Sequence, residues 1–326
     1  MALNKITYYS ELMKMIMGVE VIIPENKWGY SLADRPKDYK YPVLWLMPGG
    51  GYNYTDWARY TALELYSAQE GIAVVLPSSY YAGYMDTAHG NYPYFSVIAQ
   101  EMPEFLYHLF PLSREREDNF VAGFSMGGYG AFKLAMQFPE RYTACGVFSG
   151  PIGLVPRQPV HRSMDELGIR EHSDDPIPDA QRTLAAAFGG AENRRNTKDD
   201  NLYMLEKHLQ AGDELPAFYI ATGQEDAIAG DNYETAELLH KMGLQFEDIR
   251  DHGKHNWEYC DRHVKQFIEW IPLKNVYKME EYLVRMVSCG ILRKVTIAVP
   301  KMPFKTLFPG LRQWRILKAF VTFYDL

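Results

Sequence analysis

The sequence feature that most constrains the fold is the pentapeptide GFSMG at residues 123–127, in which a serine lies between two glycines. Glycine inside a helix costs about 1 kcal/mol relative to alanine, so the glycine-rich sequence after Ser125 calls for a geometric reason. A serine held on a sharp turn between a strand and a helix requires small residues two positions before and after it, because larger side chains would clash with neighbouring strands. The motif therefore predicts a strand, a tight turn at Ser125 and a helix.

Short β-rich runs alternate with helical patterns on both sides of this turn. We expect strands at residues 19–24, 42–48, 71–77, 119–124, 144–149, 216–223 and 244–250. We expect helices at residues 56–71, 95–110, 126–140, 230–243 and 256–271. Pro103 is expected to kink or shorten the second helix. Because several strands are continuously apolar and alternate with helices, the chain is predicted to be an α/β protein with a mostly parallel, doubly wound sheet.

Two segments depart from this alternation. Residues 151–215 are rich in Pro, Asp, Arg and Gly, with short helices at most, and a segment of this length between core strands is more often an active-site cap than a plain loop. Residues 275–326 contain nine Lys and Arg against three Asp and Glu, a charge of about +6 from 9 − 3. We expect a main domain at 1–272 with 151–215 as a cap-like insertion. The basic tail at 273–326 is an accessory packing element, an interaction tail or sequence foreign to the domain.

Composition restricts the class of protein. The net charge of −7 provides no basic field for nucleic acid. No window approaches 18 uninterrupted apolar residues, and the N-terminus lacks the pattern of a signal peptide, so we expect no membrane span and no leader. Cys145, Cys260 and Cys289 cannot all pair and have no C-x-x-C spacing, which predicts inert thiols in a reducing compartment. We therefore expect a cytoplasmic protein of undetermined oligomeric state.

A serine at such a turn needs a base, and the base needs an orienting acid. On this type of turn the partners follow along the chain in the order Ser, Asp, His. The order favours the loop between the last strand and the last helix, which contains His252 and His255, over the other histidines. We predict His255 as the base because it directly precedes the helix, with His252 as the alternative. The HGKH spacing has no evident third ligand, so we predict no metal and no cofactor.

Three carboxylates after the strand at 216–223 compete for the role of the acid. Asp226 is our choice, because the carboxyl end of that strand is expected to face the histidine loop. Asp231 is expected to cap the following helix, and Glu225 to be solvated.

An acyl-transfer site of this kind also needs two backbone N–H donors for the oxyanion, and losing one costs about 10²–10³ in rate. We expect the N–H of Met126, directly after the serine, to be one donor. The other is expected from the glycine run in PGGGYNYTDW at residues 48–57, with Gly50 as the donor and Gly51 as a residue that contacts substrate.

With these residues assembled, the chain resembles the esterase D group of α/β-hydrolases, and especially its tributyrin-esterase branch. The resemblance rests on four stretches: REDNFVAGFSMGGYGAFKLAMQFPERY, PGGGYNYTDW, LPAFYIATGQEDAIAGDN and GKHNWEYCDRHVKQFIEWI. It spans roughly residues 5–272 and implies an α/β-hydrolase fold for that domain.

The resemblance also implies residue roles. It makes Ser125, Asp226 and His255 the catalytic triad, and Trp257 matches an aromatic residue beside the base. Family members often have His-Gly in the first loop, where this chain has a proline followed by glycine.

The activity implied is that of a serine carboxylesterase acting on a small-molecule ester. Enzymes of this group hydrolyse short-chain acyl esters, and relatives act on acetylated or feruloylated plant-sugar esters, on S-formylglutathione or in mycolyl transfer. Two alternatives stay open: a thioesterase of the S-formylglutathione hydrolase kind with the same triad, and a non-catalytic carbohydrate-binding homologue that keeps the fold as a shell.

Overall fold

The computed structural model describes residues 1–273 except 25–37, 89, 154–186, 188 and 190. Met1–Leu273 forms one compact unit. The predicted basic tail, apart from Leu273, and most of the predicted cap at 151–215 lie outside the described residues.

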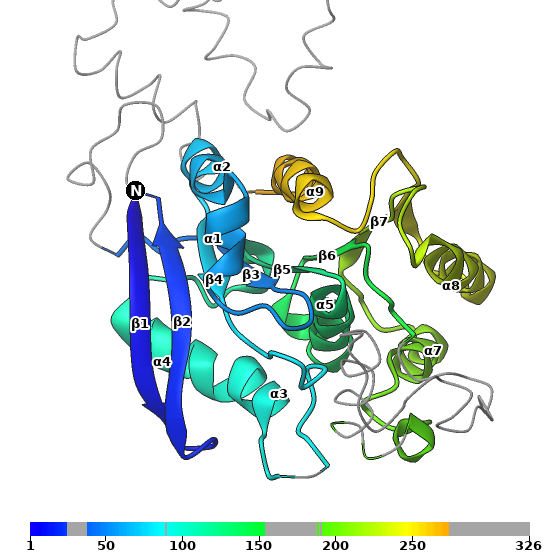
Figure 1. The fold of residues 1–326 in the computed structure, drawn as a ribbon, viewed down its shortest axis with the longest axis horizontal. Helices are drawn as coiled ribbons and strands as arrows, with labels where there is room; N and C mark the ends of the chain where they lie inside the picture. The colour runs from blue at the N-terminus through cyan, green and yellow to red at the C-terminus, as the bar shows by residue number, and fades with distance from the viewer. Residues whose placement is uncertain (25–37, 89, 154–186, 188, 190, 274–326) are drawn as a thin grey trace, which may run out of the picture. The chain divides into compact units, whose positions relative to one another are not determined.

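A single twisted sheet forms the centre of this unit, with its strands in the order β1-β2-β4-β3-β5-β6-β7-β8 (Figure 1). All neighbours from β4 to β8 pair in parallel, whereas β1 with β2 and β2 with β4 are antiparallel. This confirms the predicted mostly parallel sheet. The strands are β1 (Ala2–Ser10), β2 (Met15–Ile23), β3 (Val43–Met47), β4 (Ala73–Leu76), β5 (Asn119–Phe124), β6 (Ala144–Phe148), β7 (Ala217–Ala221) and β8 (Phe246–Ile249).

Helices cover both faces of the sheet, which explains why the central strands are apolar throughout. Successive residues of a strand point to opposite faces, so Leu44 and Phe120 join one hydrophobic core and Trp45 and Val121 join the other. The helices are α1 (Asp56–Tyr60), α2 (Leu63–Glu70), α3 (Tyr94–Ser96), α4 (Met102–Leu109), α5 (Met126–Gln137), α7 (Asn201–Ala211), α8 (Ala229–Met242) and α9 (Trp257–Trp270).

The edge strand β1 was not among the predicted strands. It pairs with β2 along its whole length, from Ala2 opposite Ile23 to Ser10 opposite Met15. From Asn4 to Ser10 its residues alternate between covered and exposed positions, so β1 lacks the continuous apolar run of the central strands. Helix α7 is a second difference, since it is longer than the short helices expected within 151–215.

The helix predicted at 95–110 is helical from Tyr94 to Leu109 but changes its geometry before Pro103. A π-helical turn at Val97–Glu101 connects α3 to α4, and Pro103 lies in the first turn of α4. Because proline has no N–H, the carbonyl oxygen of Ala99 lacks its usual helical partner. It accepts a hydrogen bond of 2.6 Å from Arg141 instead.

Candidate active site

The turn predicted at Ser125 is strained and tightly packed. Ser125 joins the end of β5 to the start of α5 with φ 53° and ψ −124°, which lies in a region that side-chain-bearing residues rarely adopt. A Cβ atom on Gly123 would lie 2.1 Å from the carbonyl oxygen of Gly127, and one on Gly127 would lie 2.3 Å from that of Met47. The two glycines of the motif are therefore required by backbone contacts. Such strain clusters at active sites, where the surroundings hold it in place.

Ser125, His255 and Asp226 come together at the carboxyl edge of the sheet. The Nε2 atom of His255 lies 2.9 Å from the Oγ of Ser125, and its Nδ1 atom lies 2.9 Å from the Oδ2 of Asp226. The side chain of Asp226 is fully buried, whereas that of His255 is 31% exposed. The imidazole thus lies between a hydroxyl group and a buried carboxylate, the arrangement that a serine nucleophile requires.

The two oxygens of the Asp226 carboxylate have different partners. Its Oδ2 faces His255, and its Oδ1 accepts a 2.8 Å hydrogen bond from the N–H of Ile228. Burial acts to raise the pKa of Asp226, but its interactions with His255, the N–H of Ile228 and Ser149 outweigh it and lower the pKa below the usual range. The group is therefore ionised at neutral pH and can orient the imidazole.

A second acid and histidine pair lies on the same two loops. The Nδ1 of His252 is 2.9 Å from the Oε1 of Glu225, and the Oε2 of Glu225 accepts a 2.7 Å hydrogen bond from the N–H of Gly253. The side chain of His252 is 86% exposed. The structure pairs His252 with Glu225 and places His255 beside Ser125.

The prediction that Asp231 is the N-cap residue of α8 is wrong. Asp231 lies in the first turn of the helix, and Ile228 occupies the N-cap position. Glu225, which was expected to be solvated, is half exposed and bonded to the histidine loop.

Backbone contacts join the acid loop to the histidine loop, and sequence reasoning missed them. The N–H of Gln224 donates to the carbonyl of Asp251 at 2.8 Å, and that of Glu225 donates to the carbonyl of Gly253 at 3.0 Å. A Cβ atom on Gly223 would lie 2.1 Å from the same Gly253 oxygen. The paired glycines are the sequence signal that could have revealed this close approach.

The glycine loop lies against the first residues of α5. A Cβ atom on Gly49 would lie 3.4 Å from the Cβ of Ser125, and one on Gly50 would lie 3.6 Å from the Sδ of Met126. Among the described residues, the N–H groups of Gly50 and Met126 have no hydrogen-bond acceptor. Two free amides beside a serine are what an oxyanion hole requires.

Gly51 differs from Gly50. Its φ of 78° lies in the left-handed region, its N–H donates to the carbonyl of Tyr80 at 3.4 Å, and a Cβ atom there would lie 2.6 Å from the hydroxyl oxygen of Tyr81. The loop conformation thus explains the glycine, and its contact with substrate stays a prediction.

Trp257 belongs to an aromatic cluster next to His255. It begins α9, stacks on Tyr60 with ring centroids 5.2 Å apart, and packs near Phe124 at 5.6 Å. The ring of Phe124 lies 4.7 Å from that of His255. Trp257 therefore supports the wall of the site behind the base.

The described part of the chain contains no cluster of three or more His, Cys, Asp or Glu side chains able to hold a metal ion. None of its helices has both the length and the apolar character that crossing a membrane requires.

Comparisons with known proteins identify a family for this chain. The family model described as "Putative esterase" covers residues 10–272 of the chain. An acetyl esterase of Caldicellulosiruptor saccharolyticus is 24% identical over 278 residues, which is 83% of this chain and 98% of that protein.

Solved structures extend the similarity to the fold. A substrate-bound, fluorophosphonate-binding serine hydrolase of Staphylococcus aureus is 26% identical with a TM-score of 0.70, covering 84% of this chain and 99% of its own. An S-formylglutathione hydrolase of the same organism is 26% identical with a TM-score of 0.67, covering 83% and 98%.

Proposed function

This chain belongs to that esterase family and is a serine hydrolase with the α/β-hydrolase fold, and we propose that it is a carboxylesterase for short-chain acyl esters. The observation that carries the proposal is the hydrogen-bonded series from Ser125 through His255 to Asp226, with both links at 2.9 Å. We assign these three residues as nucleophile, general base and orienting acid.

In the first half of the reaction, the Nε2 atom of His255 takes the proton of Ser125 as its Oγ attacks the ester carbonyl. Asp226 keeps the other ring nitrogen protonated and stabilises the imidazolium that forms. The amides of Gly50 and Met126 donate to the oxyanion, since both are free and adjacent. Collapse of the tetrahedral intermediate breaks the bond to the alcohol, which leaves with the proton of His255.

The acyl-enzyme is then cleaved by water through the same groups. His255 deprotonates the water, the resulting hydroxide attacks the acyl carbonyl, and the proton returns to the Oγ of Ser125 as the carboxylic acid leaves. The 31% exposure of the His255 side chain allows this water to reach the base.

An acetyl group is the acyl group we favour, because the acetyl esterase relative aligns over nearly all of its own length. Acetyl or feruloyl esters of plant sugars are the substrate class that the family resemblance suggests. We further propose a catalytic domain at 1–272 with a cap at 151–215, and a cytoplasmic location based on the cysteine content.

The test is hydrolysis of p-nitrophenyl acetate by the full chain and its Ser125→Ala variant. We expect the wild type to hydrolyse the ester and to be labelled by a fluorophosphonate probe, and the variant to lose both properties. A variant that retains full turnover would remove Ser125 from the mechanism. A wild type that neither reacts nor is labelled would support the alternative of a non-catalytic, carbohydrate-binding homologue.

A thioesterase acting on S-formylglutathione is the second candidate, favoured by the Staphylococcus aureus S-formylglutathione hydrolase that shares the fold at 26% identity. It would use the same triad, so residue substitutions do not separate the two. The two candidates are separated by comparing kcat/KM for S-formylglutathione with kcat/KM for acetylated xylo-oligosaccharides, since kcat/KM for the true substrate class should be higher by orders of magnitude.

A further inference from the structure

Tyr84 has a backbone conformation that tyrosine rarely adopts. Its φ of 51° lies in the left-handed region, and its side chain is completely buried. Residues other than glycine stay in this region only where the surrounding structure holds them, and they cluster at functional sites. The hydrogen bonds of Tyr84 in the described structure go to Ser79, Pro48 and Lys133 and to none of the triad residues, so its strain calls for a separate explanation.

The strained residue is anchored through its backbone and its ring. The N–H of Tyr84 donates to the Oγ of Ser79 at 3.1 Å, and its carbonyl oxygen accepts from the Nζ of Lys133 at 2.9 Å. The ring packs directly on α5, because a Cβ atom on Gly130 would lie 2.3 Å from its Cγ. Three independent contacts therefore fix the direction in which the side chain points.

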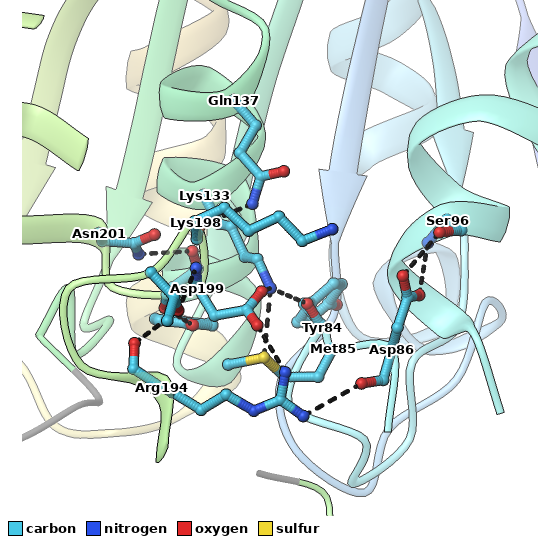
Figure 2. Close-up of polar contacts among 12 residues, drawn as sticks. Tyr84, Met85, Asp86, Ser96, Lys133, Gln137, Arg194, Lys198, Asp199 and Asn201 are labelled. Atoms are coloured by element: carbon cyan, nitrogen blue, oxygen red, sulfur yellow. Dashed lines mark hydrogen bonds and ion pairs between the residues drawn. The ribbon is translucent and has the colours of Figure 1, made fainter. Parts of the chain in front are cut away.

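Lys133 is itself held by a buried ionic cluster, shown in Figure 2. Its side chain is fully buried, with Nζ 2.6 Å from the Oδ1 of Asp199, whose Oδ2 lies 2.7 Å from Arg194. The ammonium group also contacts the sulfur of Met85 at 3.2 Å. Because its contacts are all within the protein core, Lys133 serves to fasten the Tyr84 backbone to α5.

The hydroxyl group of Tyr84 donates a 2.7 Å hydrogen bond to the carbonyl oxygen of Pro48, the residue that begins the glycine loop. That oxygen is enclosed on its other side, since a Cβ atom on Gly127 would lie 2.5 Å from it. Burial raises the pKa of the Tyr84 phenol well above its ordinary value, so the hydroxyl group remains a donor at working pH.

Two successive peptide groups of the glycine loop are anchored in this way. The carbonyl of Pro48 is bound by Tyr84, and that of Gly49 accepts from the N–H of Tyr52 at 3.3 Å. In a trans peptide the C=O and N–H groups point in opposite directions, so the second anchor aims the N–H of Gly50 away from the loop. Glycine has no intrinsic preference that would keep this orientation without the anchors.

We propose that Tyr84 is a positioning residue for the oxyanion hole. Its backbone is fixed by Lys133 and Ser79, and its hydroxyl group holds the Pro48–Gly49 peptide, so that the next peptide of the glycine loop presents the N–H of Gly50 to the reacting carbonyl. The inference rests on the proposed function, because Gly50 is the donor assigned there. It extends that function to a completely buried residue 41 positions before the nucleophile in the sequence, from 125 − 84.

The experiment compares Tyr84→Phe with Tyr41→Phe in the full chain. Tyr41 is a matched control, because it is a buried tyrosine whose hydroxyl group also donates to a proline carbonyl, that of Pro24 at 3.2 Å. The measurements are kcat and KM for p-nitrophenyl acetate and the inhibition constant of a trifluoromethyl ketone, whose adduct with serine places an oxyanion in the hole.

We expect Tyr84→Phe to lower kcat/KM by about 10- to 100-fold through kcat, the range for a misplaced or lost oxyanion donor. The inhibition constant of the ketone should rise by the same factor, whereas KM stays nearly constant. Tyr41→Phe should change each quantity by less than about threefold. If Tyr84 has a purely structural role, Tyr84→Phe should lower the thermal stability and leave the ratio of ketone affinity to KM unchanged. That result would overturn the inference.

A graded variant covers the case in which Tyr84→Phe does not fold. Ser79→Ala removes the contact to the Tyr84 N–H and leaves the hydrogen bond from Tyr84 to Pro48 possible. We therefore expect kcat/KM and the affinity for the ketone to fall less than in Tyr84→Phe, and both by the same factor. If kcat/KM and the affinity for the ketone do not fall by the same factor in Ser79→Ala, the proposal is refuted. A wild type that hydrolyses esters through Ser125, combined with a fully active Tyr84→Phe, removes this inference and keeps the proposed function.

Discussion

Replacement of Asp226 by asparagine tests the catalytic assignment most directly. The carboxylate serves two donors at once, with Oδ1 on the N–H of Ile228 and Oδ2 on the Nδ1 of His255. Asparagine has one acceptor oxygen and one amide nitrogen that only donates. It can satisfy the Ile228 N–H or orient His255 correctly, but not both.

The preferred arrangement of the asparagine follows from this conflict. The Ile228 N–H is part of the turn before α8 and does not move, so the asparagine oxygen stays on it and the amide nitrogen faces His255. That donor forces Nδ1 of the imidazole to become the acceptor and places the ring proton on Nε2, toward Ser125. In that tautomer His255 cannot accept the serine proton, and kcat is expected to fall by about 10⁴, or about 5.4 kcal/mol at 1.36 kcal/mol per factor of ten.

Glu225→Gln is the matched control, because Glu225 makes the equivalent contact to His252 from the adjacent position. This pair is exposed, and exposed ion pairs contribute little, so the control should retain turnover within about threefold. Stopped-flow hydrolysis of p-nitrophenyl acetate measures both variants, and urea unfolding verifies that both are folded. The reasoning is refuted if Asp226→Asn keeps near-wild-type turnover or if Glu225→Gln loses as much.

Two further predictions concern stability. Gly123→Ala should abolish folding or lower the free energy of unfolding by more than about 3 kcal/mol, since its Cβ would meet a backbone oxygen at 2.1 Å. In α8, a Cβ atom on Gly230 would meet nothing within 4 Å, so Gly230→Ala should raise the free energy of unfolding by up to about 1 kcal/mol. Urea titration measures both changes. Burial acts to raise the pKa of Asp199, but Lys133 and Arg194 lower it below the ordinary 3.8, so the unfolded chain binds more protons near that pH. Stability should therefore fall as the pH drops through and below about 3.8, and urea unfolding of Asp199→Asn should show a shallower fall; an equally steep one would contradict the assignment.

Sequence alone was sufficient for the strand, turn and helix at Ser125, because this information is local. The glycines at 123 and 127 report a backbone contact that any side chain would prevent, and the apolar runs report strands buried on both faces. The chain order of Ser, Asp and His then restricted the base to two histidines in one loop. Strand β1 could not be predicted in this way, because an edge strand with alternating exposure has no distinctive apolar run.

Tertiary structure decided the pairings. Glu225 with His252 and Asp226 with His255 are nearly equivalent by sequence separation. Only the packing of the two loops buries Asp226 and places His255 beside Ser125, and leaves the other pair exposed to solvent. Likewise, no local pattern links Tyr84 to Pro48, since a hydrogen bond between residues 36 positions apart depends on where α5 and its ionic cluster place the tyrosine. Local propensities are set by near neighbours along the chain, whereas the aim of a catalytic side chain or amide is set by contacts between distant segments.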